Sequence, residues 1–383
     1  MSDDLEESAA VVIACCESVS EETEGFRIYR MRVTEVVIGD SKITNTVIEV
    51  PSLQELPQDG IFWTVGYGET SIEWIARKQV SPKAVPYLLG LGSLPEPGPQ
   101  RLEYFLSFLQ HDDELVASDA YDEFAEASLE DIAALSDQLD RMWVRNQLRD
   151  ASVPRHRRRL CWMLLSQCGT AADAQLFDES LGRRQVDPTF DPGMDAAIAC
   201  YIGLSGEKGL ARIEREFLAN PDAEYLDSFA AISAIRVHGT ELNVLPRERL
   251  AASLRIMLNR PTLADLVISD LARWEDWTAV DRIIELFEGA TEETRFVKPA
   301  AVLYLKSCPL PDASQALDRL RGIDPQAVEL AESSMKLYPG LATIPVPPPD
   351  QEESSPEAPD RATPRLAEKP PRNPRVSGAS SKD

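Results

Sequence analysis

The stretch RLEYFLSFLQHDDELVASDAYDEFAEA, residues 101–127, decides the fold class of this chain. Four apolar residues in its first half follow the i, i+3, i+4, i+7 spacing of an amphipathic helix: Leu102, Phe105, Leu106 and Leu109. After the polar turn at 111–113, a second apolar series starts at Leu115. Two short helices joined by such a turn form an αα-hairpin, and neither can bury its apolar face alone. The stretch therefore predicts further helical layers packed against it.

The same helix-start signals recur down the chain. Asp191-Pro192 and Asp324-Pro325 each put a side-chain acceptor at the N-cap and proline at the first helical position. We predict hairpin starts near residues 101, 129, 155, 192, 222, 262 and 295, so that most gaps run from roughly 26 to 40 residues. That spacing is typical of helical repeat arrays, and it predicts an α-solenoid over residues 101–338.

The residues before this region predict a small all-β domain over residues 9–80. Five short segments are rich in apolar and β-branched residues and are bounded by Gly, Pro or Asp: 9–17, 26–37, 46–50, 61–65 and 71–80. Five strands in so short a span suit either an OB-like barrel or a sandwich. The segment Gly66-Tyr67-Gly68 lacks the third glycine of a dinucleotide loop and the lysine of a P-loop, so it predicts a hairpin turn.

Two proline-rich segments flank the helical region. Residues 81–100 hold five prolines and three glycines, and this density predicts a linker without a helix. Residues 339–383 hold eleven of the chain's 28 prolines and too little apolar mass to fold, which predicts a disordered tail.

The hairpin spacing and the capping signals resemble HEAT-type repeats, which are irregular two-helix units stacked into a solenoid. The resemblance extends from residue 101 to about residue 330. A small β module followed by such repeats is also similar to a bacterial family of unassigned activity, through stretches such as Leu271-Ala272-Arg273-Trp274-Glu275-Asp276-Trp277. The expected fold class is therefore mainly α: a HEAT-like α-solenoid, preceded by the small all-β domain and followed by the disordered C-terminal tail. The resemblance implies no chemistry.

The charge balance narrows the range of partners. The formal net charge is −25, from 64 acidic and 39 basic residues. Nucleic-acid affinity comes largely from Lys and Arg, so we expect no nucleic-acid partner, and an anionic membrane surface is disfavoured for the same reason.

No apolar run approaches the roughly 20 residues that span a bilayer. Acidic residues precede the first apolar run, where a secretory signal has basic ones, so we expect a cytoplasmic protein, or an exported one if its start lies upstream of Met1.

No constellation in the sequence is typical of an active site, a cofactor site or a metal site. The three histidines (His111, His156 and His238) lie far apart, and none stands at metal-site spacing from another. His238 is predicted to be a cation that closes a helix, followed by Gly239 as the residue that ends it. The six cysteines include no C-x-x-C pair and are expected to be free thiols. We therefore predict no catalytic, cofactor-binding or metal-binding residue.

A switch of charge marks one candidate protein-binding strip. Residues 112–140 include eleven acids and no Lys or Arg, whereas residues 141–159 include seven arginines and one acid. Adjacent hairpins of opposite sign can simply pair with each other. The alternative is that an acidic segment of a partner protein docks on the basic cluster formed by Arg155, Arg157, Arg158 and Arg159.

Trp274 and Trp277 form a second candidate. At i, i+3 they are predicted to share one helix face. Two tryptophans in a solenoid usually fill the gap between layers, but a groove that exposed them would offer a stacking surface to a peptide or a flat ligand.

These patterns favour a non-enzymatic protein-interaction scaffold that holds another protein on the concave surface of its repeat array. The alternative is small-molecule or pigment binding in the solenoid groove, with or without catalysis. The sequence leaves the oligomeric state open.

Overall fold

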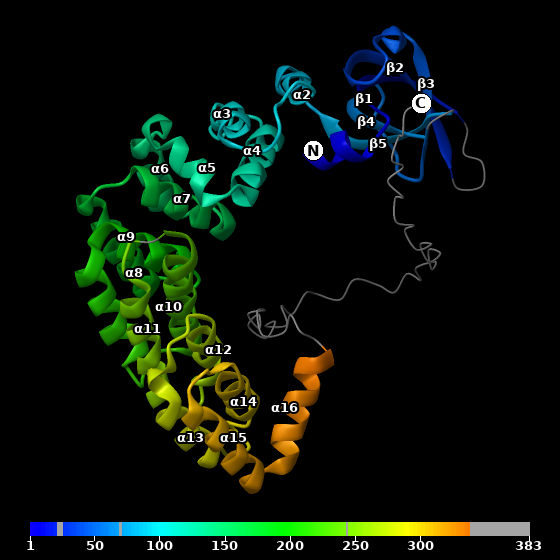
Figure 1. The fold of residues 1–383 in the computed structure, drawn as a ribbon. Coiled ribbons are helices and arrows are strands. Elements are labelled where there is room, and N and C mark those ends of the chain that lie inside the picture. The colour runs from blue at the N-terminus through cyan, green and yellow to red at the C-terminus, as the bar shows by residue number, and fades with distance from the viewer. Residues whose placement is uncertain (21–25, 69–70, 243, 338–383) are drawn as a thin grey trace, which may run out of the picture. The chain divides into compact units, whose positions relative to one another are not determined.

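Strands form the N-terminal part of the structure and helices form the rest (Figure 1). The computed structural model describes residues 1–20, 26–68, 71–242 and 244–337. The strands are β1 (Ala10–Val19), β2 (Arg27–Ile38), β3 (Val47–Ser52), β4 (Ile61–Tyr67) and β5 (Glu73–Val80). The helices are α1 (Ser2–Glu7), α2 (Val85–Leu91), α3 (Pro99–Leu106), α4 (Glu114–Glu126), α5 (Leu129–Ala134), α6 (Arg141–Arg149), α7 (Arg155–Cys168), α8 (Gln175–Val186), α9 (Met194–Ile213), α10 (Tyr225–Val237), α11 (Arg247–Arg255), α12 (Asp265–Arg273), α13 (Val280–Glu288), α14 (Val297–Ser307), α15 (Pro311–Ile323) and α16 (Pro325–Leu337).

The five strands form one antiparallel sheet in the order β3-β2-β1-β4-β5. All five predicted strands are present, with ends shifted by at most two residues. The predicted hairpin joins β4 and β5, but its turn comes later than the expected 66–68, because Gly66 and Tyr67 still belong to β4 and pair with Trp74 and Glu73. The edge strands β3 and β5 come within 8 Å of each other between Cα atoms, but no ladder joins them in the described part of the chain. The predicted all-β module is thus confirmed, and its form is a half-barrel.

Strand β1 is the central strand of the sheet, and it is buried on both faces because a separate core packs against each face. Val12 and Ala14 belong to the core inside the half-barrel, whereas Val11 and Ile13 belong to a second core that includes Tyr87 of α2. This explains why β1 is a continuous apolar run instead of an alternating one. The second core continues through the helices, so that the described strands and helices, up to residue 337, belong to one compact unit.

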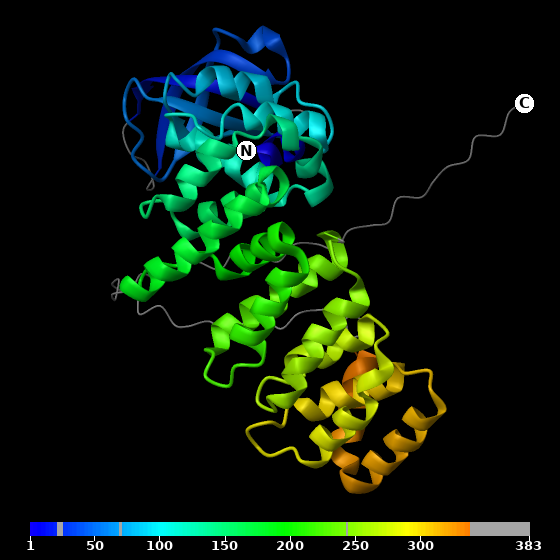
Figure 2. The same cartoon turned by 90° about the vertical axis from the view of Figure 1, so that its left-hand side faces the viewer.

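The helices after the sheet are stacked hairpins (Figure 1 and Figure 2). The predicted hairpin starts correspond to α3, α5, α7, α9, α10, α12 and α14, with differences of at most three residues. Each of these helices contacts the next one in the series, and α14 contacts α16. Each helix of this series is the first of its hairpin, so we call the series α3, α5, α7, α9, α10, α12 and α14 the first-helix layer. Helix α9 contains both helices of one hairpin, which follow each other with only a kink between them. The kink is at Gly206, whose φ of 59° is rarely adopted by residues that carry a side chain.

The prediction of a linker without a helix at 81–100 is wrong in one respect. Helix α2 lies in this segment, and its Pro86 occupies the first turn, where the missing N–H of proline costs no hydrogen bond. Tyr87, Leu88 and Leu91 are buried in the second core. The segment therefore packs the sheet against the first hairpin.

Within residues 1–20, 26–68, 71–242 and 244–337, no helix is long and apolar enough to cross a membrane. The tail predicted at 339–383 lies outside the described residues.

Candidate binding sites

Six of the seven arginines of the basic run are ion-paired, mostly with acids of the following hairpin. Five pairs point forward along the chain: Arg141–Asp173, Arg145–Asp173, Arg149–Glu179, Arg155–Asp191 and Arg159–Asp195. Of the seven arginines, Arg157 alone reaches back to the acidic run, where it pairs with Glu114 and lies over the ring of Tyr121. The run therefore joins neighbouring hairpins and is not an open positive strip.

Arg158 does not fit the predicted role of a contact residue, because it is buried at 3% exposure. Its guanidinium donates hydrogen bonds to the carbonyl oxygens of Val153 (2.5 Å) and Asp191, and it lies over the ring of Phe190, 4.2 Å from the centroid. Burial lowers the pKa of Arg158. This side chain ties together the loops that precede α7 and α9. Of the predicted strip, the side chains of Arg155 and Arg159 remain half or more exposed, at 62% and 50%.

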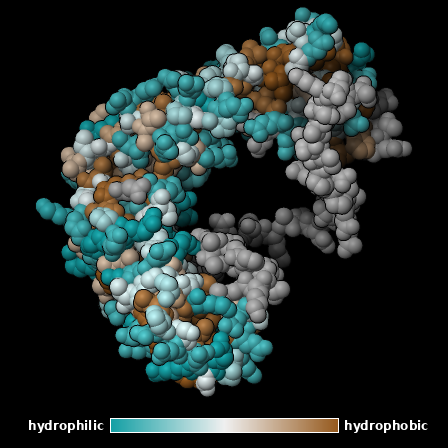
Figure 3. Space-filling model, viewed as in Figure 1, coloured by the Kyte–Doolittle hydropathy of each residue, from teal (hydrophilic) through white to brown (hydrophobic). Residues whose placement is uncertain are grey.

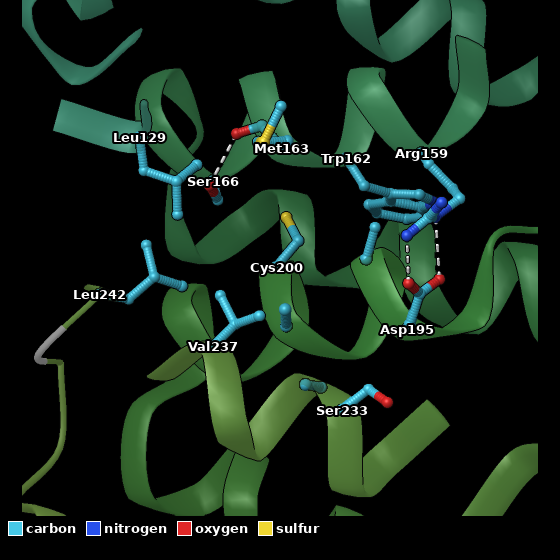
Figure 4. A pocket seen from close by; sticks show the side chains of 13 residues that line it. Leu129, Arg159, Trp162, Met163, Ser166, Asp195, Cys200, Ser233, Val237 and Leu242 are labelled. Carbon is cyan, nitrogen blue, oxygen red and sulfur yellow. Dashed lines mark hydrogen bonds and ion pairs between the residues drawn. The ribbon is translucent and has the colours of Figure 1, made fainter. Parts of the chain in front are cut away.

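The first-helix layer contains a concave apolar site beside Arg159, which we call the α7–α10 slot (Figure 4). The surface of the hairpins that faces the viewer is largely hydrophilic (Figure 3), so an apolar hollow differs from such a surface. Six of the apolar side chains that line the slot come from four helical elements and the turn η5 (His238–Leu242): Leu129, Trp162, Met163, Cys200, Val237 and Leu242. In Figure 4 the thiol of Cys200 points into the middle of the slot.

One end of the slot is polar. There Arg159 and Asp195 form a bidentate ion pair, with nitrogen–oxygen distances of 3.1 and 2.5 Å, while Leu129 and Leu242 lie at the opposite end (Figure 4). Ser166 donates to the carbonyl oxygen of Met163 at 2.7 Å, so its hydroxyl is already bonded within α7. Burial raises the pKa of Cys200 well above its usual range, which keeps this thiol neutral. The slot thus offers apolar contact in its middle and charge only at one rim.

The volume of the slot indicates what can enter it. It measures about 170 Å³. Drug-sized ligands occupy pockets of about 300–1,000 Å³, whereas an apolar cavity of about 150 Å³ accepts a benzene-sized group. The slot therefore fits one apolar side chain and is too small for a pigment.

The structure corrects the predicted geometry of the tryptophan pair. Helix α12 ends before Trp274, Glu275 takes a φ of 57°, and Trp277 starts the short turn η7 (Trp277–Ala279). The two tryptophans therefore do not share one helix face. They nevertheless line one hollow, together with Ala251 of α11 and Leu310 before α15. We call this hollow the tryptophan pocket, and its volume is about 650 Å³.

His238 is not the cation that the sequence predicts. It follows α10, as expected, but it is fully buried, and its Nε2 lies 2.8 Å from the carbonyl oxygen of Ala199. Burial disfavours the imidazolium and lowers the pKa of His238, although the bond to Ala199 opposes this shift. The neutral ring packs between α9 and α10 and has no part in either pocket.

Sequence reasoning missed the residues of the slot. Trp162, Cys200 and Val237 occupy apolar helical positions, which indicate core and carry no separate signal for a surface hollow. Arg159 and Asp195 carried part of the signal, because each is a charged residue directly before an apolar run and their charges are opposite.

Neither a protein-family model, nor a curated protein, nor a solved structure matches this chain. Among the residues that the structure describes, no group of three or more His, Cys, Asp or Glu side chains is placed to hold a metal ion.

Proposed function

We propose that this protein is a non-enzymatic interaction module, a HEAT-like solenoid that binds a segment of another protein by taking one large apolar side chain into the α7–α10 slot. The observation that carries the proposal is the slot itself, an apolar hollow of about 170 Å³ on the first-helix layer. Full burial of a Leu, Phe or Met side chain contributes about 1.5–3 kcal/mol, which is typical of the anchor residues that dominate an interface.

The rim supports the same proposal. Arg159 and Asp195 are partly exposed, and an exposed ion pair contributes only about 0–1 kcal/mol, so a partner can replace one member at little cost. An acidic residue next to the anchor would take the place of Asp195 on Arg159. The acidic partner expected from the sequence is thus retained, with Arg155 and Arg159 as its contacts and the apolar anchor as the main source of affinity.

The test is a change that fills the slot. Ala196 lies on the slot wall and is partly exposed, so Ala196→Phe adds a ring to the hollow without replacing a core residue. Ala125→Phe makes the same substitution at an exposed position of α4 outside the slot. We expect a partner captured from native lysate to be recovered by the wild type and by Ala125→Phe, and to bind Ala196→Phe about ten- to a hundredfold more weakly.

The partner's contact segment can then be recovered by limited proteolysis of the complex. Replacement of its largest apolar side chain by alanine is expected to abolish capture. Equal recovery of the partner by all three baits, with unchanged unfolding of Ala196→Phe, would exclude the slot as the binding site.

The tryptophan pocket supports a second candidate function, the binding of a flat small molecule or pigment. Its volume of about 650 Å³ lies within the range of small-ligand sites, unlike that of the slot. Quenching of tryptophan emission by candidate ligands, absent in Trp274→Leu and Trp277→Leu, is the expected result. No quenching by any flat ligand would count against this function.

A further inference from the structure

The tryptophan pocket has a charge arrangement that selects its ligand. Five charged side chains line it: Arg247, Glu248, Arg255, Glu275 and Asp276. Arg255 and Asp276 form an ion pair and so neutralise each other. In the described part of the chain, the carboxylates of Glu248 and Glu275 have no hydrogen-bond or ion-pair partner, and they outnumber the one remaining cation, Arg247. The pocket therefore favours a cation over an anion.

Both indole rings are held in place by their surroundings. The Cζ2 and Cη2 atoms of Trp274 lie against Gly239, so closely that no Cβ would fit there. Trp277 meets the ring of Tyr304 edge-on at 5.2 Å between centroids, and the Tyr304 hydroxyl donates to the carbonyl oxygen of Asp276 at 2.6 Å. The rings are half-buried, and each has surface left that faces the hollow. Fixed aromatic faces attract cations most strongly when the ring is Trp.

The turn that carries Glu275 adds an independent observation. Glu275 is an exposed residue at a φ of 57°, a conformation that costs a side-chain-bearing residue about 1–2 kcal/mol and costs glycine almost nothing. The strain places this carboxylate at the pocket beside the two indoles. The conformation itself ends α12, because the backbone N–H of Asp276 donates to the carbonyl oxygen of Leu271, and glycine is the usual residue at this position of a helix end. The observation is therefore the choice of a glutamate where glycine would be unstrained.

From these observations we infer that the tryptophan pocket binds a guanidinium-bearing segment of a protein, with an arginine side chain stacked on the indoles and held by Glu248 and Glu275. A guanidinium is planar and suits both partners: it stacks on aromatic faces and meets carboxylates with two parallel hydrogen bonds. A volume of about 650 Å³ is far more than one guanidinium fills, which indicates a segment of several residues. This inference shares one element with the proposed function, namely that the ligand is a segment of a protein. The site itself is separate, because the tryptophan pocket and the α7–α10 slot have no lining residue in common.

The test uses the full chain and a fluorescein-labelled hexapeptide of alternating alanine and arginine, followed by fluorescence anisotropy. The same peptide with citrulline in place of arginine keeps the shape of the side chain and removes its charge. We expect the arginine peptide to bind at least about tenfold more tightly than the citrulline peptide, and the double variant Glu248→Gln/Glu275→Gln to bind the arginine peptide about tenfold more weakly than the wild type.

Two further variants separate the site from general attraction and from misfolding. Glu293 is exposed, lies outside the pocket and has no partner in the described part of the chain, so Glu293→Gln controls for the attraction of a cationic peptide to an acidic protein. Glu275→Gly removes the carboxylate and relieves the strained φ, so it is expected to be at least as stable as the wild type and still to bind more weakly.

Three results would overturn the inference: equal binding of the arginine and citrulline peptides, equal affinity of the double variant and Glu293→Gln, or binding of free arginine amide as tight as that of the peptide. The last result would assign the pocket to a small cation and not to a segment. The variant Ala196→Phe is expected to bind the arginine peptide like the wild type, so failure of this inference and failure of the proposed function are distinguishable.

Discussion

Gly239 lies directly against the indole ring of Trp274, and a Cβ on Gly239 would come within 2.4 Å of the Cζ2 atom. The two residues belong to consecutive hairpins, one just after α10 and the other just after α12. The φ of Gly239 is not in the left-handed region, so the glycine is required here for close approach and not for its backbone freedom. This contact sets the position of one wall of the tryptophan pocket.

Gly239→Ala is expected to displace the Trp274 ring and to lower the free energy of unfolding by about 1–3 kcal/mol, because the added methyl group overpacks a closed contact. Urea unfolding measures the loss, and the tryptophan emission spectrum reports the displaced ring. Gly182→Ala is the matched control: nothing lies within 4 Å of a Cβ at this exposed helical position, so the change is expected to be neutral or to stabilise α8 by about 0.5–1 kcal/mol. Equal effects of the two substitutions would show that the contact is unimportant.

Because His238 is buried, we expect the protein to lose stability in mild acid. Burial lowers the pKa of His238, so the folded protein holds a neutral ring while the unfolded chain takes up a proton near pH 6.5. Between pH 6.5 and the lowered pKa the unfolded state binds more protons, and the free energy of unfolding therefore falls with decreasing pH, by at most about 1.4 kcal/mol per pH unit from this group. His238→Gln retains a donor for the Ala199 carbonyl oxygen and removes the titration.

The measurement is urea unfolding of the wild type and His238→Gln at intervals from pH 7.5 to pH 5. The difference between the two is expected to shrink or reverse as the pH falls. His156→Gln makes the same substitution at an exposed position and is expected to retain the wild-type loss. An unchanged difference across the range would mean that His238 does not titrate in this window.

Asp173 also makes the free energy of unfolding fall with decreasing pH, but in a more acidic range than His238. The side chain of Asp173 is 1% exposed; it accepts hydrogen bonds from the backbone N–H of Thr170 (2.8 Å) and from Arg141 (2.8 Å), and it also pairs with Arg145. Burial alone would raise the pKa of Asp173, but the bonds from Thr170 and Arg141 outweigh it and lower the pKa. The carboxylate therefore contributes stability that is fully present above about pH 4 and is lost as the pH falls through the lowered pKa.

Asp173→Asn is expected to lower the free energy of unfolding at pH 7 by about 1–3 kcal/mol, and by less below about pH 4. Asp137→Asn, at an exposed position without a partner in the described chain, is expected to change it by no more than about 0.5 kcal/mol. A loss in Asp173→Asn that did not diminish in acid would rule out the carboxylate as its source.

Most of the helical framework was predictable because its signals are local. Asp324 accepts the predicted cap hydrogen bond, from the backbone N–H of Ala327, and Pro325 is the first residue of α16. The predicted cap at Asp191 is wrong by two residues, because α9 begins only at Met194. Apolar spacing and caps depend on residues three or four apart, so they set the hairpin starts without reference to the rest of the molecule. The error at α2 was also local: proline excludes a helix interior but not a first turn, and Pro86 lies in the first turn.

The sequence by itself determined the strands, the succession of hairpins and the absence of a familiar catalytic pattern. Only the tertiary structure decided that Arg158 is buried while its neighbour Arg159 lines a slot, and that Trp274 and Trp277 share a pocket without sharing a helix face. The physical reason is distance along the chain. Both hollows are bounded by side chains from different hairpins, tens of residues apart, and their shapes depend on packing between layers that no short spacing encodes.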